Sequence, residues 1–388
     1  EIMKMEVTMG YSEMEAKELV VNAGKMLVES GLITRTWGNI SARISDTQFV
    51  ITPSGLAYEA LTPDQIVIVN IADCAYEGNI KPSSEKGIHA DAYRLRPEVN
   101  FVIHTHQVKA SVISLEGKHI EVKQEIYQKI LGEVIPCAAY GISSTKKLRN
   151  AVAEAVQKFP GSNAILMKHH GTLCMGNDIA NTFEIAETLE RLAEEKYDKV
   201  CGAITKVSTK IIDYGRSERK GNSFVITCDG KTTEYNLNSM PETVSEVALL
   251  HSVIYKYSKV NNILHIVDDD VVEVSRTGHL LRPFLDDLAQ IAGVNISNVY
   301  ISLEKDGPSK RKAVARRLKH KNAVFIADAG ALCTGVTESD TFAVGMVLKK
   351  GCEADLYAAA LNNIKWLGTL DASIQRFIYI KKYSKIKK

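Results

Sequence analysis

Apolar residues recur along the chain with two different periods, which predicts a mixed α/β protein. Between Ser12 and Gly31 the spacing is helical, and Ser12 opens a sequence typical of a helix N-terminus. A continuous apolar run at residues 66–71 indicates a buried strand, and a second buried strand is expected at residues 163–168. Apolar side chains then return at helical spacing over residues 177–197. The pattern therefore alternates between helices and buried strands.

The segment Asn100–His106 is predicted to be a strand that carries a candidate metal chelate. Successive side chains of a strand point to opposite faces, so Val102, His104 and His106 share one face. Two imidazoles that stand side by side can bind one metal ion. A pair of histidines packed at a sheet surface explains the same spacing equally well, so this motif alone does not establish a metal site.

The run His169-His170-Gly171 follows the second predicted buried strand. A histidine at the end of a strand, beside a glycine, is well placed to supply a third ligand to a metal held by His104 and His106. Three histidines that leave a fourth coordination position open are typical of catalytic rather than structural zinc.

Polar residues surround the start of another predicted helix, which opens with residues 82–85. Ser83 and Ser84 stand where a helix exposes unpaired amides, so they are expected to cap the helix, to bind a phosphate, or to do both. Glu85 lies in the first turn, where interaction with the helix dipole explains it without any catalysis. His89, one turn further on, is expected to be packed or solvated rather than a ligand.

Two earlier turns contain glycine and a polar neighbour, Gly38-Asn39 and Ser54-Gly55, and a strand is expected at 49–52 between them. The glycines let backbone amides approach a ligand closely, and the asparagine and serine add hydrogen-bonding groups, which is how an anion cradle is built. Each of these sequences taken alone is also explained as an ordinary turn.

A predicted helix over residues 124–127 supplies two further acid or base candidates, Glu125 and Tyr127.

Composition places the chain among ordinary soluble globular proteins of two or three domains: it has 388 residues, 45% of them apolar and 24% charged. A formal net charge of +2 gives no reason to expect nucleic acid or a membrane as a partner. Seven scattered cysteines without a Cys-x-x-Cys favour a reduced, cytoplasmic setting. The charged first residues do not resemble a signal peptide, and the basic stretch 381–388 is expected to be a solvated tail.

The second half of the chain repeats the first. Glu85 matches Glu246 at an offset of 161, since 246 − 85 = 161, and His104 matches His265 at the same offset. Further along, the offset becomes 159. At this second offset the matching positions are Asn163-Ala164 and Asn322-Ala323, Gly171 and Gly330, Leu173-Cys174 and Leu332-Cys333, Gly176 and Gly335, and Thr182-Phe183 and Thr341-Phe342. We therefore expect one domain at 1–210 and a second at 211–388.

The second copy is predicted to be degenerate and non-catalytic. Val267 stands in place of His106 and Ala329 in place of His170, so at most His265 remains of three ligands, and a single imidazole does not retain zinc. No counterpart of the Gly38–Ser41 or Pro53–Gly55 segments is evident, although residues 224–227 echo residues 49–52. Glu246 and His265 are then relics or packing residues.

Five ordered motifs make the first roughly 200 residues resemble the class II aldolase and adducin family. They are Gly38-Asn39-Ile40-Ser41, Thr52-Pro53-Ser54-Gly55, Pro82-Ser83-Ser84-Glu85, His104-Thr105-His106 and His169-His170-Gly171. The resemblance implies two tandem α/β/α domains, each with a central, mainly antiparallel sheet flanked by helices.

The resemblance also implies roles for individual residues. One divalent metal per chain, usually zinc, would be bound by His104, His106 and His170, with Glu85 as the catalytic carboxylate. The positions that match the phosphate-binding residues of the family are Gly38, Asn39, Ser54, Gly55, Ser83 and Ser84.

These roles predict a zinc-dependent aldolase that cleaves a small phosphorylated ketose of the fuculose or ribulose type. Gln124-Glu125 resembles instead the methylthioribulose-phosphate dehydratases, where the glutamate is the general base, and Tyr127 lies two residues from the position of an aldolase tyrosine. A dehydratase is therefore the alternative enzyme. A non-catalytic, adducin-like scaffold is the third hypothesis, but a scaffold has no need of three histidines and Glu85.

Members of this family usually form tetramers, so a homodimer of tandem chains would supply four pseudo-equivalent domains. Sedimentation of the full chain in an analytical ultracentrifuge should accordingly give twice the mass of one chain. A monomer would contradict this expectation.

Overall fold

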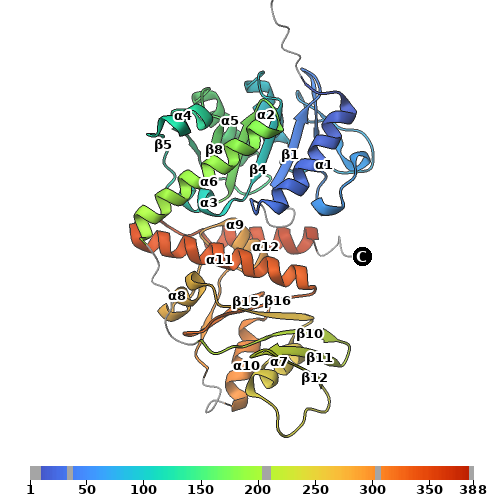
Figure 1. Cartoon of the computed structure of the whole chain (residues 1–388), viewed down its shortest axis with the longest axis vertical. Helices are drawn as coiled ribbons and strands as arrows, with labels where there is room; N and C mark the ends of the chain where they lie inside the picture. Colours follow the sequence, from blue (N-terminus) through green and yellow to red (C-terminus); the bar gives the residue numbers. More distant parts are fainter. Residues whose placement is uncertain (1–9, 33–37, 203–210, 302–306, 384–388) are drawn as a thin grey trace, which may run out of the picture. The chain divides into compact units, whose positions relative to one another are not determined.

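The computed structural model describes residues 10–32, 38–202, 211–301 and 307–383. The chain divides into two compact units, Glu1–Lys199 and Val200–Lys388, and each contains one seven-stranded sheet (Figure 1). Both sheets are mixed but mainly antiparallel and are flanked by helices. The predicted fold class, two tandem α/β domains, is confirmed.

The sheet of the first unit has the strand order β3-β2-β1-β4-β9-β8-β7, and only the β7–β8 pair is parallel. The strands, in chain order, are β1 (Gly38–Arg43), β2 (Gln48–Ile51), β3 (Val67–Asn70), β4 (Phe101–Thr105), β7 (Cys137–Ala138), β8 (Ala164–Met167) and β9 (Gly171–Gly176). A separate two-stranded sheet pairs β5 (Ile120–Glu121) with β6 (Val134–Ile135). The order places β4, with its histidines, at the centre of the main sheet.

Helices flank this sheet, and those predicted from the sequence are present. Ser12 caps the first of them, because its hydroxyl accepts a hydrogen bond from the Glu15 amide at 3.4 Å. The helices are α1 (Glu13–Glu29), α2 (Lys86–Leu95), α3 (Val108–Ile113), α4 (Glu125–Leu131), α5 (Lys146–Lys158) and α6 (Ile179–Cys201).

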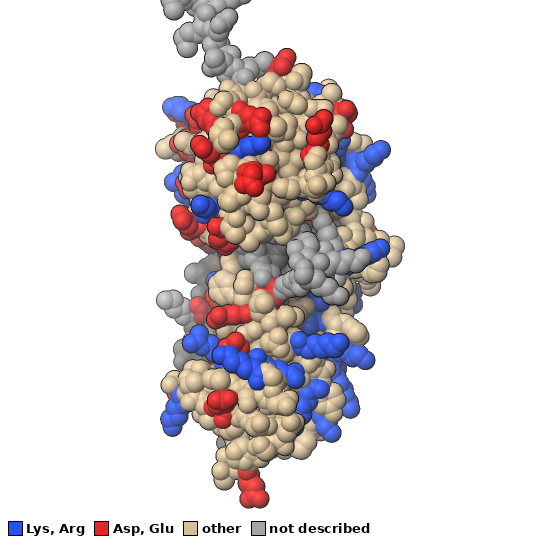
Figure 2. All heavy atoms as spheres, turned by 90° about the vertical axis from the view of Figure 1, so that its right-hand side faces the viewer, with Lys and Arg blue, Asp and Glu red and all other residues tan. Residues whose placement is uncertain are grey.

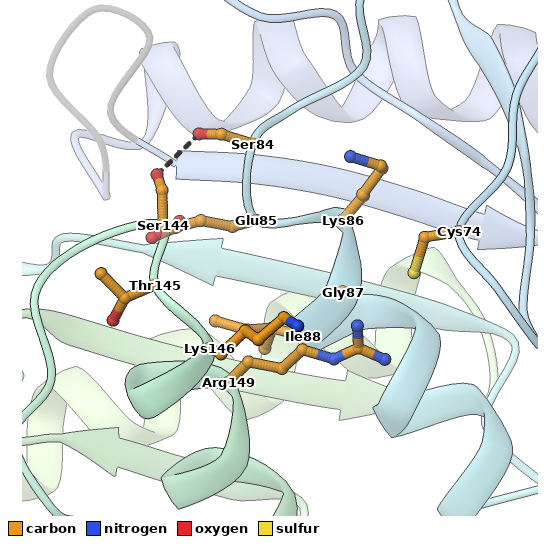
Figure 3. Close-up of a pocket in the computed structure, with 10 residues that line it drawn as sticks. All are labelled: Cys74, Ser84, Glu85, Lys86, Gly87, Ile88, Ser144, Thr145, Lys146 and Arg149. Carbon is orange, nitrogen blue, oxygen red and sulfur yellow. Dashed lines mark hydrogen bonds between the residues drawn. The ribbon is translucent and has the colours of Figure 1, made fainter.

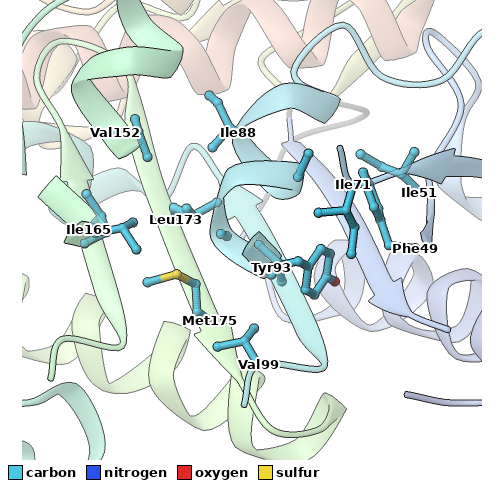
Figure 4. Close-up of a cluster of buried hydrophobic side chains, with 14 of the residues drawn as sticks. Phe49, Ile51, Ile71, Ile88, Tyr93, Val99, Val152, Ile165, Leu173 and Met175 are labelled. Carbon is cyan, nitrogen blue, oxygen red and sulfur yellow. The ribbon is translucent and has the colours of Figure 1, made fainter. Parts of the chain in front are cut away.

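The side of the sheet that faces α2 and α5 carries the main hydrophobic core of the first unit (Figure 4). Val102 lies in this core, together with Leu173 and Met175 from the neighbouring strand and Tyr93 from α2, and all are almost fully buried. His104 is two residues beyond Val102, so the alternation of the strand directs it to the same side. The core therefore holds α2 against the face that carries the histidine.

The sheet of the second unit repeats the first strand for strand, with the order β12-β11-β10-β13-β16-β15-β14. Its strands are β10 (Arg216–Lys220), β11 (Ser223–Cys228), β12 (Lys231–Asn236), β13 (Asn262–Ile266), β14 (Asn298–Val299), β15 (Ala323–Ile326) and β16 (Gly330–Gly335). Its helices are α7 (Glu246–Tyr257), α8 (Asp269–Thr277), α9 (Asp286–Ile291), α10 (Gly307–Arg317), α11 (Glu338–Leu361) and α12 (Thr369–Tyr383).

The expectation that the second half lacks a counterpart of Gly38–Ser41 is wrong for the backbone. Ser217 on β10 pairs with Ile226 and Ile263, just as Ser41 pairs with Ile51 and Val102. The counterpart is the segment 214–217, in which only the serine is retained. A sequence comparison missed it because a strand is defined by its pairing register and not by the identity of its side chains.

The predicted offset of 161 residues also needs correction, because it is one residue too short for α2 and α7. Ser41 contacts His89 and Tyr93 on α2, and Ser217 makes the same contacts with His251 and Tyr255 on α7. These pairs differ by 162 residues, because 251 − 89 = 162 and 255 − 93 = 162. Glu246 therefore corresponds to Ser84, and the counterpart of Glu85 is Val247.

Charge is distributed unevenly between the units. On the face drawn in Figure 2, acidic and basic side chains are interspersed over the first unit, whereas Lys and Arg gather on the second. None of the helices in the described part of the chain is long and apolar enough to cross a membrane.

The close approach of the paired strands β4 and β9 at Gly171 gives a stability prediction. A Cβ at Gly171 would lie 2.3 Å from the carbonyl oxygen of Thr105, so Gly171→Ala must separate the central strands. We expect a loss of about 1–3 kcal/mol of local unfolding free energy, measured by hydrogen exchange of peptides from these strands. The control is Gly161→Ala, since a Cβ there meets nothing within 4 Å. Equal hydrogen-exchange protection of these strands in Gly171→Ala and Gly161→Ala would contradict the prediction.

Candidate metal centre

Three histidines converge where β4 ends and its neighbouring strand β9 begins. His104 is on β4 and His106 follows the end of that strand, with their Nε2 atoms 3.1 Å apart. His170 immediately precedes β9, which pairs with β4, and its ring stacks on that of His104 with centroids 5.0 Å apart. One ligand nitrogen from each histidine lies within 4.8 Å of the others. The structure thus brings together the three residues predicted as ligands.

The tautomer of His104 is fixed by a backbone carbonyl. Its Nδ1 lies 2.7 Å from the oxygen of Thr172, and because a carbonyl only accepts, Nδ1 carries the proton. The lone pair is therefore on Nε2, which faces the other histidines. A metal-binding histidine is commonly oriented in this way, by a hydrogen bond from its second nitrogen.

His169 turns away from this cluster. Its backbone is in the left-handed region, with φ 63°, and its ring packs edge-to-face against Tyr140 at 5.4 Å between centroids. The chain reverses there so that His170 faces the site, which agrees with the expectation that only the second histidine of the pair is a ligand.

Glu85 completes the cluster and is 8% exposed. Its Oε2 lies 3.2 Å from Nε2 of His104, and its Oε1 lies 3.2 Å from Nε2 of His170. Burial acts to raise the pKa of this carboxyl, but when His104 and His170 are positively charged they outweigh burial and hold the pKa well below its usual value. The direct contact with the histidines goes beyond the helix-dipole interpretation.

Two neutral donors hold the carboxylate of Glu85. Asn39 donates from Nδ2 to Oε2 at 3.2 Å, and Ser143 donates from Oγ to Oε1 at 3.1 Å. Ser143 was not among the predicted site residues, because it lies in the loop before α5 and no motif includes it. Asn39 was predicted only as a phosphate-binding residue, because hydrogen bonding between residues 46 positions apart has no sequence signal.

The donor set of this centre suits a divalent cation. The Nε2 lone pair of His104 faces a carboxylate oxygen of Glu85 at 3.2 Å, and two such electron-rich atoms repel unless a positive charge lies between them. Three imidazole nitrogens with room for a further ligand match the preference of zinc at catalytic sites. His104, His106 and His170 could therefore bind a divalent metal.

The loops of the predicted anion cradle meet beside Glu85. Pro53 and Pro82 form an isolated bridge, and the Ser54 amide donates to the carbonyl of Lys81 at 2.9 Å. Ser83 accepts from the Glu85 amide at 3.2 Å in the turn before α2, whose N-cap residue is Glu85 and has no side-chain cap. The turn 54–55 and the serines 83–84 are thus neighbours in space, as the prediction requires.

A polar pocket opens on the other side of Ser84, between the first turns of α2 and α5 (Figure 3). Ser84 and Ser144 contact each other there, with their Oγ atoms 2.8 Å apart. The full lining is Cys74, Ser84, Glu85, Lys86, Gly87, Ile88, Ser144, Thr145, Lys146 and Arg149. The charge of Arg149 is balanced by Asp91, through contacts of 2.6 and 2.9 Å. Lys86 and Lys146 leave this pocket positively charged.

The two remaining candidates, Glu125 and Tyr127, lie on α4 and make their contacts elsewhere. The carboxylate of Glu125 pairs with Lys129 at 3.0 Å and is 82% exposed. The hydroxyl of Tyr127 donates to Glu195 at 2.6 Å, and this hydrogen bond raises its pKa. These contacts do not bring either side chain to the histidine cluster of its own chain.

The corresponding position in the second unit has different chemistry. His265, the counterpart of His104, accepts at Nδ1 from the Tyr214 amide at 3.1 Å and donates from Nε2 to the carbonyl of Ala329 at 2.6 Å. It is therefore the opposite tautomer, with no lone pair toward the former site. Within the described residues, the one cluster of three metal-ligating side chains is that of His104, His106 and His170.

Residues 18–197 and 208–356 each match the model of the family described as Class II Aldolase and Adducin N-terminal domain. The chain belongs to this family and contains two tandem copies of its domain. The resemblance deduced from five short motifs is thereby confirmed.

Known relatives match about half of the chain. The 5-methylthioribulose-1-phosphate/5-deoxyribulose-1-phosphate aldolase of Escherichia coli O45:K1 (strain S88 / ExPEC) is 35% identical over 177 residues, which are 46% of this chain and 81% of that protein. The L-fuculose phosphate aldolase of Escherichia coli (strain K12) is 34% identical over 164 residues, or 42% and 74%. A solved L-fuculose 1-phosphate aldolase structure is 28% identical and covers 51% of this chain and 93% of its own, with a TM-score of 0.45.

The centre predicts a defined metal content. The purified full chain should contain about one divalent metal ion, measured by elemental mass spectrometry, because the histidine cluster is a single site. His106→Ala should lose it, since two imidazoles bind zinc far more weakly than three. His265→Ala, at the one ligand position that the second unit retains, should leave the content unchanged. Two ions per chain, or a loss in the control, would show that the second unit also binds metal.

Proposed function

We propose that the first unit is a zinc-dependent class II aldolase, which cleaves a small phosphorylated ketose of the fuculose or ribulose type. The observation that carries this proposal is the position of Glu85, whose carboxylate contacts two of three convergent histidines at 3.2 Å. The printed activities of the relatives, which are ribulose-type and fuculose phosphate aldolases, support the same substrate class.

The residues of the centre can be assigned roles in this reaction. Zinc, when bound by the three histidines, supplies a Lewis acid that polarises the substrate carbonyl. As the carbon–carbon bond breaks, the carbon next to that carbonyl must gain a proton, and Glu85 is placed to transfer it. Asn39 and Ser143 each hold one of its oxygens, so the base keeps one orientation.

The phosphate would lie in the cradle that the sequence predicts. Its residues are Gly38, Asn39, Ser54, Gly55, Ser83 and Ser84. The cradle supplies neutral donors, and Lys86 and Lys146 in the adjoining pocket add positive charge that favours an anionic substrate. The phosphate also fixes the register of the carbonyl relative to Glu85.

A sugar-phosphate dehydratase is the second candidate, favoured by Gln124-Glu125 and by the high exposure of Glu125. An exposed residue on α4 would act on the site of a neighbouring subunit, and the same holds for Tyr127 in the aldolase reaction. The products separate the two functions, because an aldolase gives two carbonyl fragments and a dehydratase gives one dehydrated diketone.

The second unit, from about residue 211 onward, is in this proposal a non-catalytic copy that is kept for assembly. Val267 and Ala329 replace two ligands, and His265 is held as the wrong tautomer. A homodimer would then present two active and two inactive domains. Adducin-like scaffolding by the whole chain does not explain why the first unit retains Glu85 among three histidines.

Replacing Glu85 tests the assignment directly. Glu85→Gln should lower kcat by about 10²–10⁴-fold on a ketose phosphate that the native enzyme cleaves, because the amide cannot act as a base. The zinc content should remain at the native value. Glu246→Gln in the second unit is the control and should leave kcat unchanged. Loss of zinc from Glu85→Gln would contradict the assignment of Glu85 as base rather than ligand.

A further inference from the structure

A chain of buried hydrogen bonds leads from the core of the first unit to Glu85. The hydroxyl of Ser41 lies 2.7 Å from that of Tyr93 and 2.6 Å from Nδ1 of His89. Nε2 of His89 lies 2.5 Å from Oδ1 of Asn39, whose Nδ2 donates to Glu85 at 3.2 Å. All five side chains are at most 8% exposed.

The carboxylate fixes the direction of every bond in this chain. Because Glu85 only accepts, Asn39 must present Nδ2 to it and Oδ1 to His89. Oδ1 also only accepts, so His89 carries its proton on Nε2 and accepts from Ser41 at Nδ1. Ser41 in turn accepts from Tyr93. Each amide, imidazole and hydroxyl therefore has a single arrangement that satisfies all its neighbours.

His89 remains neutral in this arrangement. Burial is the main cause that lowers its pKa, to about 3, and the nearby His104 acts in the same direction. The ring is therefore a fixed dipole, and the expectation of a packed histidine is confirmed by its complete burial.

The second unit shows which of these hydrogen bonds serve the fold and which serve the metal centre. Ser217 contacts His251 and Tyr255 at 2.6 Å, as Ser41 contacts His89 and Tyr93. His251, however, donates from Nε2 to the backbone carbonyl of Tyr214 at 2.7 Å. The register that matches Ser217 with Ser41 matches Gly215 with Asn39, since 217 − 41 = 176 and 215 − 39 = 176. In the second unit this series of hydrogen bonds thus ends at a backbone carbonyl, so it serves only packing.

We propose that Tyr93, Ser41 and His89 are positioning residues, which lock the amide of Asn39 so that it holds Glu85 toward the metal centre. This inference rests on the proposed function. The physical reason is that the Asn39 amide can otherwise rotate about its last torsion, and then presents an oxygen to the carboxylate, where two acceptors repel. The base would lose one of the two donors that hold it.

Matched serine variants of the full, zinc-loaded chain test the proposal. Ser41→Ala and Ser217→Ala remove the same hydroxyl from the same network, so both should lower local stability to a similar extent. Only Ser41→Ala should lower kcat, by about tenfold, with KM and zinc content changed less than twofold. Ser41→Thr, which keeps the hydroxyl, should restore kcat. Tyr93→Phe and Tyr255→Phe give a milder pair with the same logic. Equal kcat effects of the two serine variants would overturn the proposal.

A second measurement needs no substrate. Long-range ¹H–¹⁵N spectra of the histidine rings, with His89 assigned by its loss in His89→Gln, should show the Nε2–H tautomer. The Nδ1–H tautomer would overturn the direction of the chain and with it the proposal. The native Nε2–H form together with no cleavage of any ketose phosphate would instead show that the proposed function is wrong while the hydrogen-bond chain is present.

Discussion

The pairing of β4 with β9 is the constraint on which the site depends. These strands are hydrogen-bonded along their length, from Phe101 opposite Gly176 to Thr105 opposite Thr172. At their end the backbone of Gly171 packs so closely on Thr105 that no side chain fits between them. Residues 104, 106 and 170, distant in sequence, are thereby held within the reach of one metal ion. The rest of the domain determines which other side chains face these three histidines.

The second constraint is electrostatic. A buried carboxylate beside neutral imidazoles is unfavourable without positive charge, so a divalent cation bound by the three histidines would stabilise it. The helix α2 brings Glu85 to this position from a separate part of the chain, and the hydrophobic core under α2 keeps it there (Figure 4). Packing therefore determines the electrostatics, because the same core residues that stabilise the fold also hold the acid against the histidines.

The repeat shows which parts of this arrangement belong to the fold alone. The second unit keeps the strand order, the close approach at Gly330 and the buried contact between Ser217 and His251. It has lost the ligands, and His265 has become a packed histidine. The architecture therefore does not require the three histidines, which agrees with the general independence of fold and function.

Much of this structure could be predicted from the sequence, and the failures have physical causes. The histidine pair follows from strand periodicity, and the family follows from motif order. The contact of Ser143 with Glu85 could not be foreseen, because it depends on how a loop packs over a distance of 58 residues. Strand β10 was missed because pairing register, and not residue identity, defines equivalent positions in a sheet. The one-residue shift at Glu246 was missed because only the contacts of α7 with Ser217 reveal it.

In the proposed zinc centre, three imidazoles of the first unit bind one ion and leave one coordination position open. X-ray absorption at the zinc edge of the zinc-loaded full chain measures this ligand set. We expect a shell of N and O atoms at about 2.0–2.1 Å, with the scattering pattern of three imidazoles and no sulfur. A zinc–sulfur distance near ~2.3 Å, or a signal from a single imidazole, would contradict it, because the metal would then be bound elsewhere in the chain.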